Sequence, residues 1–99
     1  MAYEIRYTPA ARAHLKELTA RQRATVVRGV EEQLVHQPTV ETRHRKPMRA
    51  SPIAPWELRI GDLRVYYDVE HEPEQMVGIV AIGIKRRNHV TISGVEVDL

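Results

Sequence analysis

The most constraining feature of the sequence is an alternation of apolar and polar residues on both sides of Gly61-Asp62. Residues 56–60 place Trp, Leu and Ile at every second position, and residues 63–69 resume the same alternation. Successive side chains of a strand point to opposite faces, so this period of two predicts two strands with one apolar face each. A Gly-Asp pair between two such strands is a turn signal, and the pattern therefore predicts a β-hairpin.

The first third of the chain predicts a strand and two helices. Residues 3–7 alternate in the same way, and Thr8-Pro9 then supplies a helix N-cap followed by proline at the first helical position. Apolar residues three and four apart follow in two stretches, which predicts a first helix and a second helix that Pro38 ends; the buried face of the second comprises Val26, Val27, Val30 and Leu34. Gly29 lies inside the second helix, where it costs about 1 kcal/mol relative to alanine, and we expect it to mark close packing.

The rest of the chain predicts more sheet and one long irregular connection. Residues 76–84 form a nearly continuous apolar run rich in Val and Ile, as expected of a central strand buried on both faces. A polar turn at 71–75 precedes this run, and a last short strand is expected at 90–92. Residues 37–55 contain four of the six prolines and no clear period, and long irregular segments in compact domains are often functional.

The predicted order of elements is therefore β-α-α-β-β-β, with a fifth strand at the end. A helical hairpin packed on one face of an antiparallel sheet is the simplest arrangement, because each element has one apolar face to bury. We predict an α+β fold in which an N-terminal strand and a helical hairpin precede an antiparallel meander, with residues 1–99 forming a single domain. The second face of the sheet would remain free, at least in part, for function.

The composition argues against several classes of chemistry. The chain has no cysteine, so it contains no disulfide, thiolate nucleophile or zinc–thiolate site. Its five histidines lack the spacing of metal ligands, and neither a glycine-rich phosphate loop nor a serine-nucleophile context occurs. There is no apolar N-terminal run typical of a signal peptide, and no stretch approaches the roughly 18 apolar residues of a membrane span. We expect a cytoplasmic protein that needs no metal or other cofactor and does not contact a membrane.

Positive charge is concentrated in one block of the sequence. The net charge is only +2, but residues 43–64 contain six Lys/Arg against two acidic residues. Residues 65–99 contain three Lys/Arg, all at 85–87, against six acidic residues. A clustered basic surface attracts a phosphate backbone even when the total charge is small. A solvated loop and turn would give the same pattern, and both interpretations stay open at this point.

Several motifs of the sequence resemble segments of the RelE/ParE superfamily of bacterial toxins. Residues 56–67 (WELRIGDLRVYY) are similar to the central hairpin of that superfamily, and residues 45–48 (RKPM) are similar to the segment that often precedes it. Residues 81–87 (AIGIKRR) resemble the strand that ends in glycine and basic residues, and residues 3–11 resemble the first strand-to-helix step. The resemblance covers nearly the whole chain and rests on the order and spacing of these motifs together.

The resemblance implies the toxin of a type II toxin–antitoxin pair, with a cognate antitoxin protein as its partner and with operator DNA contacted only through the antitoxin complex. Many members cleave mRNA on the ribosome without a metal ion, by attack of the ribose 2′-OH on the adjacent phosphate. We therefore expect an endoribonuclease whose targets are mRNA and the ribosome. Two alternatives stay open: a ParE-like inhibitor of DNA gyrase that catalyses nothing, and a degenerate toxin that only binds its antitoxin.

The resemblance also implies site residues. Arg64 matches the hairpin arginine that contacts the scissile phosphate, and Arg59 matches the second basic position of the preceding strand. Lys85 or Arg87 matches the basic residue that supports the transition state. His89 is a candidate general acid or base, because histidine exchanges protons near neutral pH. A further set of basic residues is assigned to RNA binding: Arg43, Arg45, Lys46, Arg49 and Arg86.

Two positions depart from a typical ribonuclease of this superfamily. The first basic position of the hairpin is Glu57 here, which would repel a phosphate unless it acts as a general base. The C-terminal tyrosine that some ribonuclease members use is replaced by Thr91. Both departures favour the gyrase-inhibitor alternative, and strands often carry Arg and Lys on a solvated face without any catalytic role.

Overall fold

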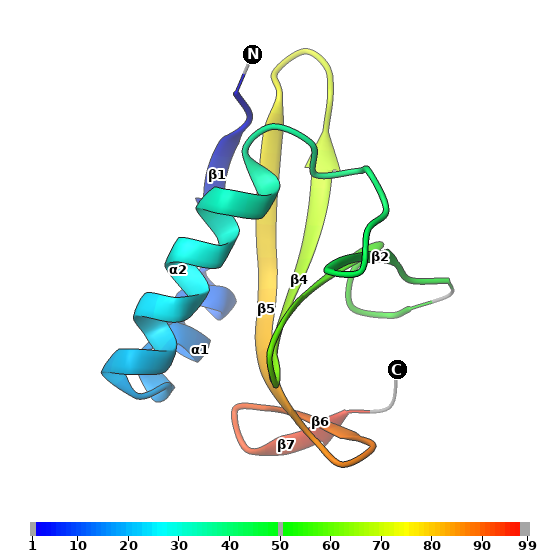
Figure 1. Cartoon of the computed structure of the whole chain (residues 1–99). Helices are drawn as coiled ribbons and strands as arrows, with labels where there is room; N and C mark the ends of the chain where they lie inside the picture. Colours follow the sequence, from blue (N-terminus) through cyan, green and yellow to red (C-terminus); the bar gives the residue numbers. More distant parts are fainter. Residues whose placement is uncertain (1, 50, 98–99) are drawn as a thin grey trace.

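Two helices pack on one face of a twisted seven-stranded sheet (Figure 1). The computed structural model of the chain describes residues 2–49 and 51–97. The elements are, in order, β1 (Glu4–Tyr7), α1 (Pro9–Glu17), α2 (Ala20–Leu34), β2 (Arg45–Pro47), β3 (Trp56–Ile60), β4 (Leu63–Glu70), β5 (Met76–Arg86), β6 (His89–Ile92) and β7 (Val95–Val97). This order confirms the predicted α+β fold and adds two short strands, β2 and β7, that the sequence did not predict.

Both helices begin at a threonine cap. Thr8 Oγ1 accepts a hydrogen bond from the Ala11 amide at 3.1 Å, and Pro9 occupies the first turn of α1 as predicted. Thr19 Oγ1 accepts from the Gln22 amide at 3.1 Å while Gln22 Oε1 accepts from the Thr19 amide at 3.0 Å, which forms a capping box. The caps fix where each helix starts and therefore which side chains it turns toward the sheet.

The sheet is an antiparallel meander from β2 to β7, with one exception. β1 pairs in parallel with the first half of β5, from Glu4 opposite Met76 to Tyr7 opposite Ile79. β5 is eleven residues long, and β6 pairs only with its far end, from Ile84 to Arg86. β1 therefore covers an edge that would otherwise leave backbone groups of the central strand exposed.

The main core lies between the helices and the sheet. α2 buries Val26, Val30 and Leu34 against β3 and β4, as predicted. Val27 was predicted to share this buried face, but it is 39% exposed because it follows Val26 around the helix and falls outside the stripe. Gly29 confirms the expected close packing, since a Cβ atom at this position would collide with Ile60 Cδ1 at the end of β3.

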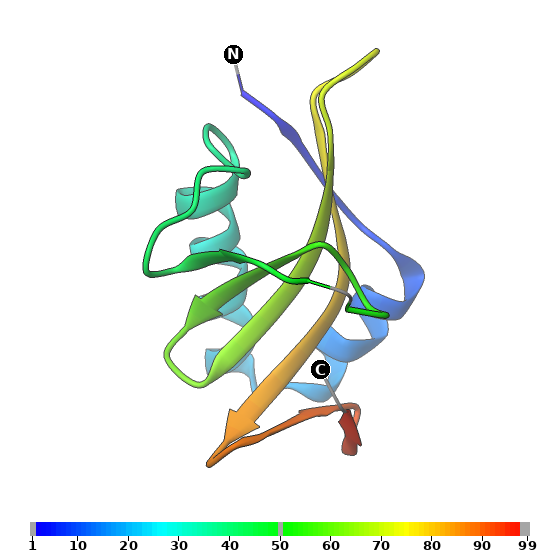
Figure 2. The same ribbon diagram turned by 90° about the vertical axis from the view of Figure 1, so that its right-hand side faces the viewer.

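The opposite face of the sheet is only partly free. Tyr66 of β4 and Ala81 of β5 form a second buried cluster with Ala54 from the β2–β3 connection and Val90 from β6. Figure 2 shows this side, with the β2–β3 connection in green and the β6–β7 hairpin in orange and red. The connection and the hairpin cover parts of the sheet face and leave a pocket between them. In the described part of the chain, no helix is long and apolar enough to cross a membrane.

Candidate functional site

A pocket of about 810 Å³ lies on the face of the sheet away from the helices. The end of β2, the polar face of β3, the β5–β6 turn and β7 form its walls. Its charged and titratable lining residues are Lys46, Arg49, Glu57, Arg59, Lys85, His89 and Glu96. Four cations therefore oppose two carboxylates, which gives the pocket a net positive charge before the histidine is counted.

Strand alternation explains how these side chains meet. Glu57 and Arg59 are two residues apart on β3 and share one face, and Lys46 of β2 lies directly opposite Glu57 in the antiparallel register. Lys85 follows the apolar run of β5. A tight turn, in which Arg87 has φ = 58°, then reverses the chain and pairs His89 with Arg86. The pocket is thus formed where strand pairing brings together short segments that are far apart in the sequence.

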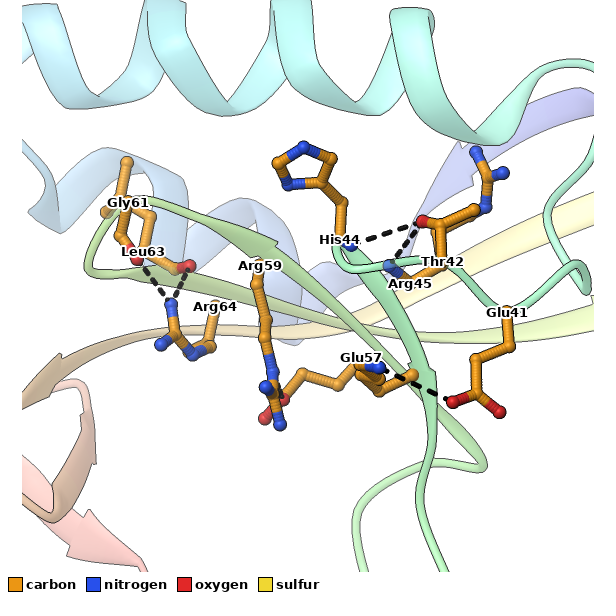
Figure 3. A network of polar contacts seen from close by, with 10 residues as sticks. Glu41, Thr42, His44, Arg45, Glu57, Arg59, Gly61, Leu63 and Arg64 are labelled. Carbon is orange, nitrogen blue, oxygen red and sulfur yellow. Dashed lines mark hydrogen bonds and ion pairs between the residues drawn. The ribbon is translucent and has the colours of Figure 1, made fainter.

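Glu57 is buried and paired with Arg59. Arg59 Nε lies 2.7 Å from Glu57 Oε1 (Figure 3). The Glu57 side chain is 8% exposed whereas that of Arg59 is 44% exposed, so the carboxylate sits under its partner and the guanidinium remains accessible to a ligand. A buried carboxylate needs such a partner, because a charge removed from water without one is strongly unfavourable. Arg59 therefore partly neutralises the negative charge of Glu57, which would otherwise repel a phosphate.

His89 is paired with a residue that the sequence analysis missed. His89 Nδ1 lies 2.6 Å from Glu96 Oε1, between side chains that are both well exposed. Glu96 belongs to β7, and the signal for this strand was the alternation of Val95, Glu96 and Val97 after a Ser-Gly turn dipeptide. The contact occupies Nδ1 and leaves Nε2 as the ring nitrogen for a ligand.

Arg64, the predicted phosphate contact, is bonded to the hairpin turn. It is 9% exposed, and its Nη1 donates to the carbonyl oxygens of Gly61 at 2.7 Å and Leu63 at 2.9 Å (Figure 3). Arg64 lies directly opposite Arg59 across β3 and β4, and like charges in that position repel. The two guanidinium groups bind different acceptors, and Arg64 holds the hairpin turn without joining the described lining of the pocket.

Arg45 also lies away from the pocket, although the sequence analysis assigned it to RNA binding. It is 7% exposed; its Nε donates to Val40 O at 2.8 Å, and its Nη1 donates to Gln33 O at 2.8 Å and Gln33 Oε1 at 3.0 Å. The alternation of β2 explains this position, because Arg45 turns toward α2 while Lys46 turns toward the pocket. Arg45 ties the connection after α2 to the end of that helix.

The structure divides the ten predicted site residues equally. It brings Lys46, Arg49, Arg59, Lys85 and His89 to the pocket. Within the described residues, the pocket lining does not include Arg43, Arg45, Arg64, Arg86 or Arg87. Thr91, at the position of the missing tyrosine, pairs with Ile84 in the β5–β6 ladder. Across residues 2–49 and 51–97, no cluster of His, Asp and Glu suited to a metal ion is found.

Tyr66 lies in the second cluster and was not predicted as a site residue. It is fully buried opposite Glu57 in the β3–β4 register, and its hydroxyl lies beside the Glu57 carboxylate. Burial raises the pKa of the Tyr66 phenol well above its ordinary value, and the negative charge of Glu57 and a hydrogen bond with its carboxylate raise it further. The Glu57 carboxylate therefore lies beside both the Arg59 guanidinium and the Tyr66 phenol.

Comparison with known proteins places the chain in a family. The family model that matches is described as the ParE toxin of the type II toxin–antitoxin system, parDE, and it covers residues 5–89. A chain of the toxin–antitoxin complex RelBE2 from Mycobacterium tuberculosis superposes with a TM-score of 0.74 at 28% identity. That match covers 86% of this chain and 100% of the other. Curated proteins give no match. The chain therefore belongs to the ParE toxin family within the RelE/ParE superfamily and is the toxin of a type II toxin–antitoxin system.

Proposed function

We propose that this toxin is an endoribonuclease that cleaves mRNA in the pocket without a metal ion. The observation that carries the proposal is the arrangement of the lining: four cations surround two groups able to transfer protons, Glu57 from β3 and His89 from the start of β6. Cations attract the phosphate backbone, and a base and an acid on different walls suit a displacement in which one oxygen attacks as another leaves.

The proposed reaction begins at the ribose 2′-OH. Glu57 accepts its proton as the 2′-oxygen bonds to the adjacent phosphorus, and the bond from phosphorus to the 5′-oxygen breaks. Protonated His89 gives its proton to that leaving oxygen, so the products are a 2′,3′-cyclic phosphate and a free 5′-OH. Arg59 and Lys85 stabilise the negative charge that accumulates on the phosphate oxygens in the transition state.

Two contacts support these roles. Arg59 holds Glu57 Oε1 at 2.7 Å and thereby fixes the carboxylate within the pocket. Glu96 holds His89 Nδ1 at 2.6 Å, an arrangement in which a carboxylate orients an imidazole. Lys46 and Arg49 lie on the β2 side of the pocket, where they would bind phosphates flanking the cleaved one.

The same proposal includes the partners. The substrate is mRNA during translation on the ribosome, and a cognate antitoxin inhibits the toxin by covering the pocket. The RelBE2 structure is a complex of a toxin with its antitoxin, which supports an antitoxin partner for this chain as well.

The test is cleavage by the purified toxin of an mRNA bound to purified ribosomes. We expect products that end in a 2′,3′-cyclic phosphate. Glu57→Gln should cleave about 100-fold more slowly than the wild type, the scale of lost general-base catalysis. Arg21→Ala, at an exposed position of α2, is the matched control and should cleave at the wild-type rate. An unchanged rate for Glu57→Gln, or products that end in a 3′-OH, would contradict the mechanism.

A second candidate is inhibition of DNA gyrase without catalysis. It is favoured by the engagement of two hairpin arginines within the protein, Arg59 with Glu57 and Arg64 with the turn carbonyls, which leaves fewer cations for a phosphate. Supercoiling assays with the same protein distinguish the two functions. Blocked supercoiling with intact RNA would support this candidate and reject the ribonuclease.

A further inference from the structure

One wall of the pocket is apolar, and the proposed reaction makes no use of it. Met48, Val90 and Val97 form this apolar wall and line the pocket together with its charged groups. Val90 belongs to the second buried cluster, while Met48 and Val97 pack against that cluster and remain half-buried. Apolar side chains that stay partly open in a charged pocket are available for contact with an apolar part of a ligand.

Met48 is held in place by the sheet. Its amide donates to Pro55 O at 2.8 Å, which continues the β2–β3 register by one pair beyond Pro47 and Trp56. Since alternate residues of an extended chain share a face, Met48 lies on the same side of the chain as Lys46. Two residues of extended chain span about 7 Å, so an apolar and a cationic side chain start within the length of one nucleotide of each other.

The two valines come from the β6–β7 hairpin. Val90 lies directly opposite Val97 in the antiparallel register, so both side chains point to the same face of the hairpin. Gly83 of β5 allows this hairpin to approach the sheet closely, because a Cβ atom there would lie 2.7 Å from Thr91 O and 3.0 Å from Val90 Cγ1. The apolar wall is therefore fixed by strand pairing on both of its sides.

A nucleotide matches this combination of surfaces. The four cations of the pocket attract phosphate groups, whereas the two faces of a nucleobase are apolar and stack on apolar or aromatic side chains. Within the described residues no Trp or Tyr lines the pocket, so the apolar wall would supply this contact. The thioether of Met48 suits it, because methionine sulfur makes favourable contacts with aromatic rings. The pocket volume of about 810 Å³ is within the range of sites that enclose a small molecule, and a phosphate group alone would leave the apolar wall unused.

We propose that the apolar wall is a nucleobase subsite, in which Met48 covers one face of the base of the nucleotide whose 2′-OH attacks. Arg59 and Lys85 hold the phosphate attached to the same ribose. Because the contact is with the face of the base and not with its edge, the subsite accepts purines and pyrimidines. The assignment to the attacking nucleotide rests on the proposed function. The subsite itself requires only that the pocket binds a nucleotide through both its base and its phosphate.

The first measurement compares ligands that differ only in the base. Adenosine 3′-monophosphate carries a base, and methyl riboside 3-phosphate carries a methoxy group at the same carbon. The Kd of adenosine 3′-monophosphate should be about tenfold lower, the scale of an aromatic group brought into contact with apolar side chains. Uridine 3′-monophosphate should also bind more tightly than the riboside. Equal Kd values for the three ligands would overturn the subsite.

Ile53 provides a matched control for Met48. Both side chains are half-buried and pack against the second cluster, but of the two only Met48 belongs to the described lining of the pocket. Met48→Ala should raise the Kd of adenosine 3′-monophosphate about threefold to tenfold and leave that of the riboside unchanged, whereas Met48→Leu and Ile53→Ala should bind like the wild type. Lys85→Ala should weaken both ligands and keep the ratio of their Kd values. An equal loss in Met48→Ala and Ile53→Ala would reveal an effect of packing alone and would refute the role of Met48.

The second measurement observes Met48 directly in the wild-type protein. The chain has three methionines, so labelling of their methyl groups with ¹³C gives a simple NMR spectrum in which Met48→Leu identifies the Met48 signal by removing it. The ring current of a base stacked on Met48 should move this signal during titration with adenosine 3′-monophosphate, and the riboside should not move it. Met76, at the start of β5 and outside the described pocket lining, is the internal control. A Met48 signal that responds equally to both ligands, or to neither, would contradict contact with the base.

Binding and cleavage together separate this inference from the proposed function. If the wild type prefers the nucleotides over the riboside but does not cleave ribosome-bound mRNA, the ribonuclease proposal fails and the nucleobase subsite stands. If the wild type cleaves mRNA but binds all three ligands equally, the subsite fails and the ribonuclease proposal stands. If none of the three ligands binds, the subsite is overturned.

Discussion

The two faces of the sheet are built from the same strands and differ in how they treat polar groups. On the helix face, the Tyr67 hydroxyl and the Arg45 guanidinium are buried but bonded to backbone carbonyls. On the pocket face, Glu57 is buried beneath an exposed arginine and beside the Tyr66 phenol. The helix face therefore stabilises the fold, whereas the pocket face keeps groups that would be easier to replace if stability alone mattered.

The two roles, stabilising the core and lining the pocket, alternate between consecutive residues of a strand. Leu58 packs in the main core and Glu57 lines the pocket. The change of role at each step follows from the period of two along a strand. Substitutions at adjacent positions of the same strand can therefore affect stability and activity separately.

The largest expected effect is on the helix face of β3. Leu58→Ala removes a fully buried side chain from the main core and leaves a cavity. We expect the free energy of unfolding to fall by about 2–5 kcal/mol, as for other large-to-small core changes, measured by urea denaturation. Glu57→Gln, one residue away, is the control: it keeps the shape of the side chain and should affect RNA cleavage far more than stability. A larger loss of stability in Glu57→Gln would refute the division between the faces.

A second comparison separates two arginines that the sequence analysis grouped together. Arg45→Ala removes three buried hydrogen bonds from a charged group, so the free energy of unfolding should fall by about 2–3 kcal/mol. Arg49→Ala, at an exposed position in the pocket, should change stability by less than about 0.5 kcal/mol.

The same Arg49→Ala variant should weaken RNA binding in a salt-dependent way. A plot of the logarithm of the binding constant against the logarithm of the salt concentration should become shallower by about 0.7, the slope due to one cation that neutralises a phosphate of a single strand. Binding titrations at several salt concentrations measure this change. A stability loss in Arg49→Ala equal to that in Arg45→Ala, with an unchanged slope, would erase the distinction between the two arginines.

Most of the fold was predictable because its signals are local. Thr8-Pro9 predicted the start of α1, and Gly61-Asp62 predicted the turn between β3 and β4. The parallel pairing of β1 with β5 was not predictable in the same way, because it joins segments from opposite ends of the chain and has no periodic signature of its own. The short strands β2 and β7 have only three residues each, so even the alternation in β7 is too short to predict a strand without the Ser-Gly turn signal before it.

The site was less predictable because it depends on which polar partner each side chain finds. Arg59 and Arg64 carry the same charge at facing positions, and the sequence does not reveal that one binds Glu57 and the other binds turn carbonyls. Arg45 and Lys46 are consecutive cations, and only the register of β2 against β3 decides which one reaches the pocket. Residue type and spacing predicted a basic surface. The hydrogen bonds and the strand register decide which of its basic residues line the pocket.

The smallest expected effect is on the free energy of unfolding at alkaline pH, and it involves one buried tyrosine on each face of the sheet. Burial raises the pKa of Tyr66 and of Tyr67 above the ordinary tyrosine value of about 10, so the folded protein holds both phenol protons more tightly than the unfolded chain. The stability that these groups contribute is fully present below pH ~10 and is lost as the pH rises toward their folded values. The free energy of unfolding should therefore decrease above that pH by up to about 1.4 kcal/mol per pH unit for each tyrosine.

Denaturant titrations between neutral and alkaline pH measure this slope. Tyr66→Phe and Tyr67→Phe should each remove one tyrosine's share of it, because both phenols are buried. At neutral pH, Tyr67→Phe should also lower stability, because it loses the hydrogen bond from its hydroxyl to Pro38 O. A wild-type slope in Tyr66→Phe would show that its phenol ionises as freely in the folded protein as in the unfolded chain. The pocket face would then be open to solvent at Tyr66, and the contrast between the two faces would end at the surface of the pocket.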